Sequence, residues 1–171
     1  MLATVFIYRL PIFEKSTSRL VKAALGGWEL SGIVLMQTGL PLNTTLGGPQ
    51  GSNGLANATN RPDFSGTISY PKTVDAFFSK TGFSAPAVGA WGNSPRGFVR
   101  GPGRQNWNMS LFKSFVFNER GTRLEFRAES FNTWNHTQFR NVSTTYTSGD
   151  FGQVTSVWDP RVFQLGLKFL F

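Results

Sequence analysis

The chain has 171 residues and a formal net charge of +8. It contains no cysteine, which excludes disulfides and thiolate metal sites, and only one histidine, which excludes a zinc site built from several histidines. Charged residues make up 15% and aromatic residues another 15%, with 17 Phe and 19 Gly. Aromatic-rich stretches broken by Gly, Pro, Asn and Ser are typical of an all-β protein. The basic residues are scattered, which disfavours nucleic-acid binding, and an anionic lipid surface fits the modest basic excess better.

The first part of the chain predicts two strands. Residues 2–10 form a continuous stretch that ends at Pro11, and residues 11–27 form a connector in which we expect a short helical turn around residues 20–25. Residues 28–38 alternate Trp28, Leu30, Val34 and Met36 against Glu29, Ser31 and Gln37. The N-terminus has neither the basic start nor the small-residue cleavage site of a signal peptide. We therefore expect that a longer, exported protein is missing its beginning here.

A long irregular excursion is predicted for residues 39–105. Loops of this length are uncommon inside compact soluble domains, whereas long extracellular loops are usual in outer-membrane barrels. Within it, Gly47–Gly54 is rich in glycine but lacks the following Lys-Ser/Thr of a phosphate-binding loop. We interpret that segment as a mobile surface loop.

Two further strands, residues 106–117 and 122–132, are joined by a predicted tight turn at Asn118–Gly121. The first strand places on one face Trp107, Met109, Leu111, Phe115 and Phe117. Lys113 interrupts that apolar face. A cation in mid-bilayer costs about 2–4 kcal/mol but little near the interface, so we expect its ammonium group to reach outward.

The strand at residues 122–132 carries a strict alternation of charge. Its apolar or small positions are Leu124, Phe126, Ala128 and Ser130, and its charged positions are Arg123, Glu125, Arg127 and Glu129. Four charges of alternating sign suit a wet barrel lumen, and we prefer this interpretation to a carboxylate pair for acid–base catalysis. His136 follows with no acid or nucleophile at a diagnostic spacing, so no catalytic residue is predicted.

The last strand, residues 161–171, has the clearest pattern. Its apolar face carries Phe163, Leu165, Leu167, Phe169 and Phe171. Eleven residues suit a tilted membrane-crossing strand, whereas strands of soluble sheets are usually nearer five or six. Residues 133–160 precede it as a second excursion, with a hairpin expected near Phe151–Val157. The fold class predicted is therefore an all-β, partial antiparallel transmembrane β-barrel with about five membrane strands.

The predicted topology follows from the parity of these strands. If Phe171 lies in the periplasm, the turn at Asn118–Gly121 is periplasmic and the segments at about 39–105 and 133–160 are extracellular. Trp28 and Trp107 are interpreted as interfacial girdle residues. Five strands do not close a barrel, so we expect residues 1–171 to be one part of it.

Several blocks of this sequence resemble one known family. In order, they are GGWELSGIVLMQTGLPL (Gly26–Leu42), NRPDFSG (Asn60–Gly66), RGPGRQNWNMSLFKSF (Arg100–Phe115), RLEFRAESFNTWNHTQF (Arg123–Phe139) and DPRVFQLGLKFLF (Asp159–Phe171). They resemble the C-terminal barrel region of TonB-dependent outer-membrane receptors, with the Oar-like group most similar. The resemblance spans nearly the whole chain.

The resemblance implies that residues 1–171 are a C-terminal fragment of a barrel of about 22 strands in the outer membrane of a Gram-negative-type bacterium. It implies energised uptake of a large substrate, without cofactor, metal or catalysis. The partners implied are outer-membrane lipid, the rest of the barrel and its plug, the TonB system and the barrel-assembly machinery. The assembly signal implied consists of Phe163, Leu165, Leu167, Phe169 and Phe171.

Two other functions remain as alternatives from the sequence. A soluble secreted or periplasmic all-β module could use the long loops as a ligand-binding surface. Such a module would stay in solution without detergent, which the barrel segment would not. A small hydrolase is disfavoured because no nucleophile, base and acid can be assembled from the residues.

Overall fold

The computed structural model describes residues 1–13, 15, 17–48, 59–117 and 121–171. The chain divides into two compact units, which are described separately. The sheet unit comprises Met1–Gln37, Gln105–His136 and Asp159–Phe171. The aromatic-core unit comprises Thr38–Arg104 and Thr137–Trp158.

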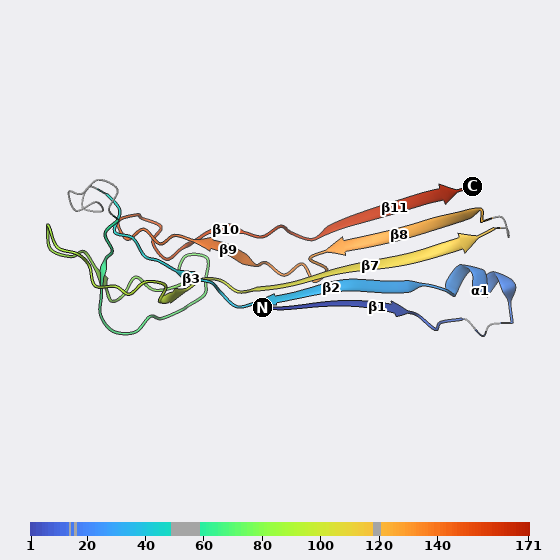
Figure 1. Ribbon diagram of the computed structural model, residues 1–171, viewed down its shortest axis with the longest axis horizontal. Coiled ribbons are helices and arrows are strands. Elements are labelled where there is room, and N and C mark those ends of the chain that lie inside the picture. Colours follow the sequence, from blue (N-terminus) through green and yellow to red (C-terminus); the bar gives the residue numbers. More distant parts are fainter. Residues whose placement is uncertain (14, 16, 49–58, 118–120) are drawn as a thin grey trace. The chain divides into compact units, whose positions relative to one another are not determined.

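The sheet unit is built on a five-stranded antiparallel sheet in the order β1-β2-β7-β8-β11 (Figure 1). The strands are β1 (Leu2–Arg9), β2 (Glu29–Gln37), β7 (Arg104–Val116), β8 (Arg123–Phe131) and β11 (Val162–Leu170). Each strand lies within two residues of the predicted range. The all-β, antiparallel fold class and the count of about five strands are therefore confirmed.

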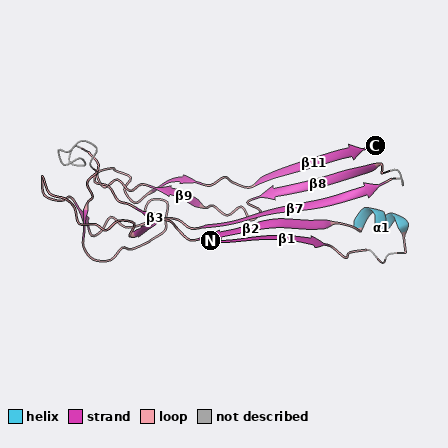
Figure 2. Ribbon diagram, in the orientation of Figure 1, coloured by secondary structure: helices cyan, strands magenta, loops and turns pink. Residues whose placement is uncertain are grey.

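The β1–β2 and β7–β8 connections lie at the same end of the sheet. Between β1 and β2 lies α1 (Arg19–Leu25) (Figure 2). At its start, the Ser18 hydroxyl accepts a hydrogen bond from the backbone N–H of Val21 at 3.5 Å. Between β7 and β8, Gly121 adopts a φ of +94°, which glycine tolerates best. The rest of the predicted turn, residues 118–120, lies outside the described residues. No helix in the described part of the chain is long and apolar enough to cross a membrane.

The sheet has two edges. Within the described residues, β1 is hydrogen-bonded to β2 alone and β11 to β8 alone, so the five strands do not close on themselves. Each edge strand is paired with its neighbour along its whole length. In the β1–β2 pair Leu2 lies opposite Met36, and in the β11–β8 pair Leu170 lies opposite Arg123. The other backbone side of each edge strand remains available for a further strand.

Within its described residues, the aromatic-core unit holds three small two-stranded sheets. They pair β3 (Pro41–Leu42) with β6 (Val99–Arg100), β4 (Asp63–Phe64) with β5 (Phe83–Ser84), and β9 (Phe139–Val142) with β10 (Val154–Val157). The expected hairpin near Phe151–Val157 is thus realised as the wider β9–β10 pair. The buried core consists of Phe77, Phe78, Phe83, Val99 and Phe151.

This core departs from the irregular excursion predicted for residues 39–105. The ring of Phe151 lies 5.2 Å from that of Phe78 and 5.1 Å from that of Phe83, both edge to face, an arrangement that aromatic rings favour. Phe151 comes from the second excursion. The two segments therefore share one core, which strand periodicity could not reveal because Phe77, Phe78 and Phe151 lie outside strands and Phe83 lies in a strand of only two residues. Of Gly47–Gly54, residues 49–54 lie outside the described residues.

A buried asparagine organises the NRPDFSG block of the aromatic-core unit. The side chain of Asn60 is 2% exposed, and its Oδ1 accepts hydrogen bonds from the N–H groups of Arg61 at 2.8 Å and Gly92 at 3.0 Å. Its Nδ2 donates to the carbonyl of Ala90 at 3.0 Å. The Arg61 guanidinium donates to the carbonyl of Ser94 at 2.6 Å. These bonds join residues 60–61 to residues 90–94 without a regular strand.

Candidate functional site

The register of the sheet separates two chemically different faces. Residues directly opposite each other on antiparallel strands project to the same face. Ala128 is paired with Leu111 on one side and Leu165 on the other, and Phe126 is paired with Lys113 and Leu167. The apolar face of β7, β8 and β11 is thus Met109, Leu111, Lys113, Phe115, Leu124, Phe126, Ala128, Ser130, Phe163, Leu165, Leu167 and Phe169.

The opposite face, here called the charged face, carries the predicted charge ladder. Glu129 is paired with Ser110 and Gln164, and Glu125 is paired with Ser114 and Lys168. The charged face of these strands is Ser110, Phe112, Ser114, Val116, Arg123, Glu125, Arg127, Glu129, Gln164, Gly166, Lys168 and Leu170. All four charged residues of the ladder are therefore brought to one face.

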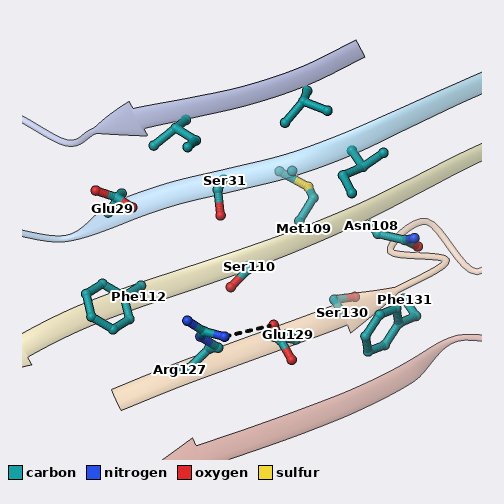
Figure 3. A pocket seen from close by; sticks show the side chains of 14 residues that line it. Glu29, Ser31, Asn108, Met109, Ser110, Phe112, Arg127, Glu129, Ser130 and Phe131 are labelled. Carbon is teal, nitrogen blue, oxygen red and sulfur yellow. Dashed lines mark ion pairs between the residues drawn. The ribbon is translucent and has the colours of Figure 1, made fainter. Parts of the chain in front are cut away.

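Neighbouring charges on β8 form ion pairs along the strand. Arg123 Nε lies 2.8 Å from Glu125 Oε1. Arg127 Nη1 lies 3.9 Å from Glu129 Oε1, the pair that is drawn in Figure 3. The two arginine side chains are 46% and 60% exposed, so each pair contributes no more than about 1 kcal/mol. The arrangement therefore pairs opposite charges on an accessible surface.

A third ion pair on the charged face was missed by the sequence analysis. Arg9 Nε of β1 lies 3.6 Å from Glu29 Oε2 of β2, and these two residues are directly opposite in the register. The sequence signal for this pair is a positive charge, Arg9, just before the β1–β2 connector and a negative charge, Glu29, just after it. The sequence of β1 is almost continuously apolar and shows no clear period, so it did not indicate which residue of β2 lies opposite Arg9.

A hollow of about 450 Å³ runs across the charged face from β1 to β8. Polar groups and apolar side chains alternate along it, with Arg127 also lying 5.8 Å from the ring of Phe112 (Figure 3). Its polar lining includes Glu29, Ser31, Asn108, Ser110, Arg127 and Glu129. Such a surface can hold water and hydrogen-bond a polar molecule. Within the described residues, no cluster of three or more His, Asp or Glu side chains is placed to hold a metal.

The predicted assembly residues lie together on the apolar face at the edge of the sheet. Phe163, Leu165, Leu167 and Phe169 are 66%, 73%, 69% and 56% exposed, and Phe171 follows the end of β11. The rings of Phe169 and Phe171 stack with centroids 6.1 Å apart. A contiguous apolar surface of this kind is typical of contact with lipid or another protein.

Lys113 differs from its prediction. Its side chain is 2% exposed, and its ammonium donates hydrogen bonds to the carbonyls of Ala24, at 3.0 Å, and Gly26. The Trp28 ring centroid lies 5.3 Å from the ammonium nitrogen and that of Phe115 lies 4.9 Å away. The expectation that Lys113 reaches outward is wrong because the last carbonyls of α1 need donors and carry the negative end of the helix dipole.

The remaining candidates make structural contacts. Trp28 packs edge to face on Phe126, with ring centroids 5.9 Å apart, and Trp107 packs on Trp134 at 6.3 Å. The side chain of His136 is exposed, and its backbone N–H donates to Asn132 Oδ1 at 3.2 Å. The girdle role of the two tryptophans stays a prediction.

Comparison with known proteins gives one family. The model of the outer membrane beta barrel domain matches residues 1–164. No curated protein and no solved structure matched the chain. The matched range includes all of β1, β2, β7 and β8, and therefore most of the sheet that carries the two faces.

Proposed function

We propose that this chain, which belongs to the outer membrane beta barrel domain family and is located in the outer membrane, forms the C-terminal wall of a TonB-dependent transporter of the Oar-like group. The transporter takes up a large substrate, and this part of it is not catalytic. Support comes from the five ordered sequence blocks between Gly26 and Phe171 that resemble that family. The location in the outer membrane argues against the alternative of a soluble ligand-binding module.

One observation carries the proposal, namely a sheet with one apolar face, one charged face and two open edges. In a bilayer, every backbone polar group needs a partner, so an open edge in lipid is strongly unfavourable. The edges β1 and β11 therefore pair with further strands of the same barrel. The apolar face contacts lipid, and Arg123, Glu125, Arg127 and Glu129 face the lumen and its plug.

In this proposal, the two ends of the sheet lie on the two sides of the membrane. The end with α1 and the β7–β8 turn is periplasmic, because short turns are usual on that side. The aromatic-core unit, residues 38–104 and 137–158, is extracellular. Because these segments share a packed core, they present an ordered surface to which a substrate can bind.

The last strand has a second role in this proposal. Phe163, Leu165, Leu167, Phe169 and Phe171 form the signal that the barrel-assembly machinery recognises. In support, these side chains lie on the free edge of the sheet and remain accessible until a neighbouring strand and lipid cover them. The same residues contact lipid after assembly.

Cross-linking to TonB in living cells tests the transporter. Cells that produce the protein are treated with formaldehyde, and their membranes are probed with an antibody raised against residues 59–104. We expect an adduct that also reacts with an antibody against TonB and that disappears in a strain without TonB. If another TonB-dependent receptor forms its adduct in the same cells while this protein forms none, the proposed function is wrong.

A further inference from the structure

The connector between β1 and β2, residues 10–28, exposes large apolar side chains at one end of the sheet. Leu20 is 82% exposed, and Ile12, Phe13 and Leu25 are each between 46% and 48% exposed. α1 has only seven residues, and helices shorter than about 12 residues are marginal in water unless something packs against them. An apolar environment would therefore stabilise the helix and cover its exposed side chains.

The order of residues in α1 gives it an apolar side. At about 100° per residue, Leu20, Val21, Ala24 and Leu25 fall within one arc of about 140°, and Lys22 lies outside that arc. Lys22 is exposed. An apolar stripe beside a basic residue is the pattern of helices that lie in a membrane interface.

The contacts of Lys113 fix where this helix lies. Its ammonium holds the carbonyls of Ala24 and Gly26, and Lys113 stands on the apolar face opposite Phe126. Trp28, which ends the connector, packs on that same Phe126. The C-terminal end of α1 is thus attached on the side of the sheet that faces lipid, so its exposed apolar side chains continue that surface.

We propose that the described part of this connector, residues 10–13, 15 and 17–28, lies in the headgroup layer of the phospholipid leaflet at this end of the barrel and binds anionic phospholipid there. This inference rests on the proposed function, because it takes the apolar face to contact lipid. By sequence the connector has three basic residues, Lys15, Arg19 and Lys22, against one acidic residue, Glu14. That basic excess is complementary to anionic headgroups.

A single-site fluorescent label tests the depth of the connector. The chain has no cysteine, so Leu20→Cys can carry an environment-sensitive label, with the unsubstituted protein as the blank. The protein is extracted from the outer membrane of the producing cells and placed in vesicles of phosphatidylethanolamine with a minor share of phosphatidylglycerol. Leu165→Cys, on the apolar face, serves as the lipid reference, and Val88→Cys, 85% exposed in the aromatic-core unit, serves as the water reference.

We expect headgroup-attached nitroxide lipids to quench the Leu20 label and aqueous iodide to leave it unquenched, with the opposite result for Val88. Adding Lys113→Gln should raise the iodide quenching of the Leu20 label, because α1 loses its attachment. Replacing phosphatidylglycerol with neutral lipid should weaken headgroup quenching of the Leu20 label. Equal quenching in the two kinds of vesicle would show that the connector has no preference for anionic lipid.

A Leu20 label in water while the Leu165 label is in lipid would overturn this inference alone. Both labels in water would overturn the lipid-facing sheet and the proposed function with it.

Discussion

In the sheet unit, the ammonium nitrogen of Lys113 lies 3.0 Å from the carbonyl oxygen of Ala24, which joins the C-terminal part of β7 to the end of α1. The two residues are far apart in sequence, and no other cation stands on the apolar face of β7, β8 and β11 as their register defines it. The apolar face therefore tolerates this cation because a helix end surrounds it. The first prediction concerns this contact.

Replacing Lys113 with Met should lower the free energy of unfolding by about 1–3 kcal/mol, because the carbonyls of Ala24 and Gly26 lose a shared donor. Urea unfolding of the protein in vesicles, followed by tryptophan fluorescence, measures this change. Lys168→Met, at an exposed position of β11, is the matched control and should change it by less than about 0.5 kcal/mol. Equal effects of the two substitutions would show that the helix contact contributes nothing.

Adjacent residues on β11 test the assignment of the two faces. Leu165→Arg puts a cation on the apolar face and should cost about 2–4 kcal/mol of unfolding free energy in vesicles if the site is near mid-bilayer. Gln164→Arg puts the same side chain opposite Glu129 on the charged face and should cost less than about 1 kcal/mol. A greater cost at Gln164 than at Leu165 would mean that the faces are reversed.

Gly92 should tolerate no side chain. A Cβ atom there would lie 1.9 Å from the carbonyl oxygen of Arg61, and the Asn60 hydrogen bonds hold both segments in place. Gly92→Ala should therefore destabilise the aromatic-core unit by about 1–3 kcal/mol. Native-state hydrogen exchange at residues 60–64 measures the loss. Gly149→Ala, where a Cβ meets nothing within 4 Å, is the control, and equal protection in both variants would contradict the packing described here.

Acid should weaken the turn before β10. The hydroxyls of Ser148 and Ser143 donate hydrogen bonds to Asp150 Oδ1 and lower the pKa of that carboxyl below its usual value. The charged form is thus favoured in the folded state. Its stabilising effect is complete above the ordinary pKa of 3.8 and is lost as the pH falls through the lowered folded pKa.

Amide exchange of residues 143–153 between neutral and acidic pH should therefore show, after correction for intrinsic exchange rates, a loss of protection at low pH. Asp150→Asn should reduce protection at neutral pH and remove its pH dependence. A pH dependence that survives in Asp150→Asn would assign the effect to another group.

The membrane strands could be predicted from the sequence because their side chains alternate strictly. In β8 and β11, charge or polarity recurs every second residue, so element, length and face all follow from the pattern of Arg123–Glu129 and Phe163–Phe169. The pairing of β7 with β8 also follows, since a predicted tight turn joins these two strands. This regularity is why the fold class was correct.

Contacts between segments that are distant in sequence could not be predicted from the alternation of side chains. Lys113 interrupted an apolar face, and nothing in its neighbourhood indicated that the end of α1 would satisfy it. The aromatic core likewise joins Phe78 to Phe151 across 73 positions, and the residues around them follow neither a helical nor a strand period. Such contacts depend on tertiary packing, which local periodicity does not encode.

In the proposed function, these strands are part of a larger closed barrel in the outer membrane. The most direct test is an immunoblot of separated membrane fractions from the producing cells, with an antibody against residues 59–104 and with samples run both unheated and boiled. We expect a band in the outer membrane, much heavier than the 18.9 kDa of this chain, whose mobility changes on boiling. A soluble band at 18.9 kDa that is indifferent to heating would contradict it.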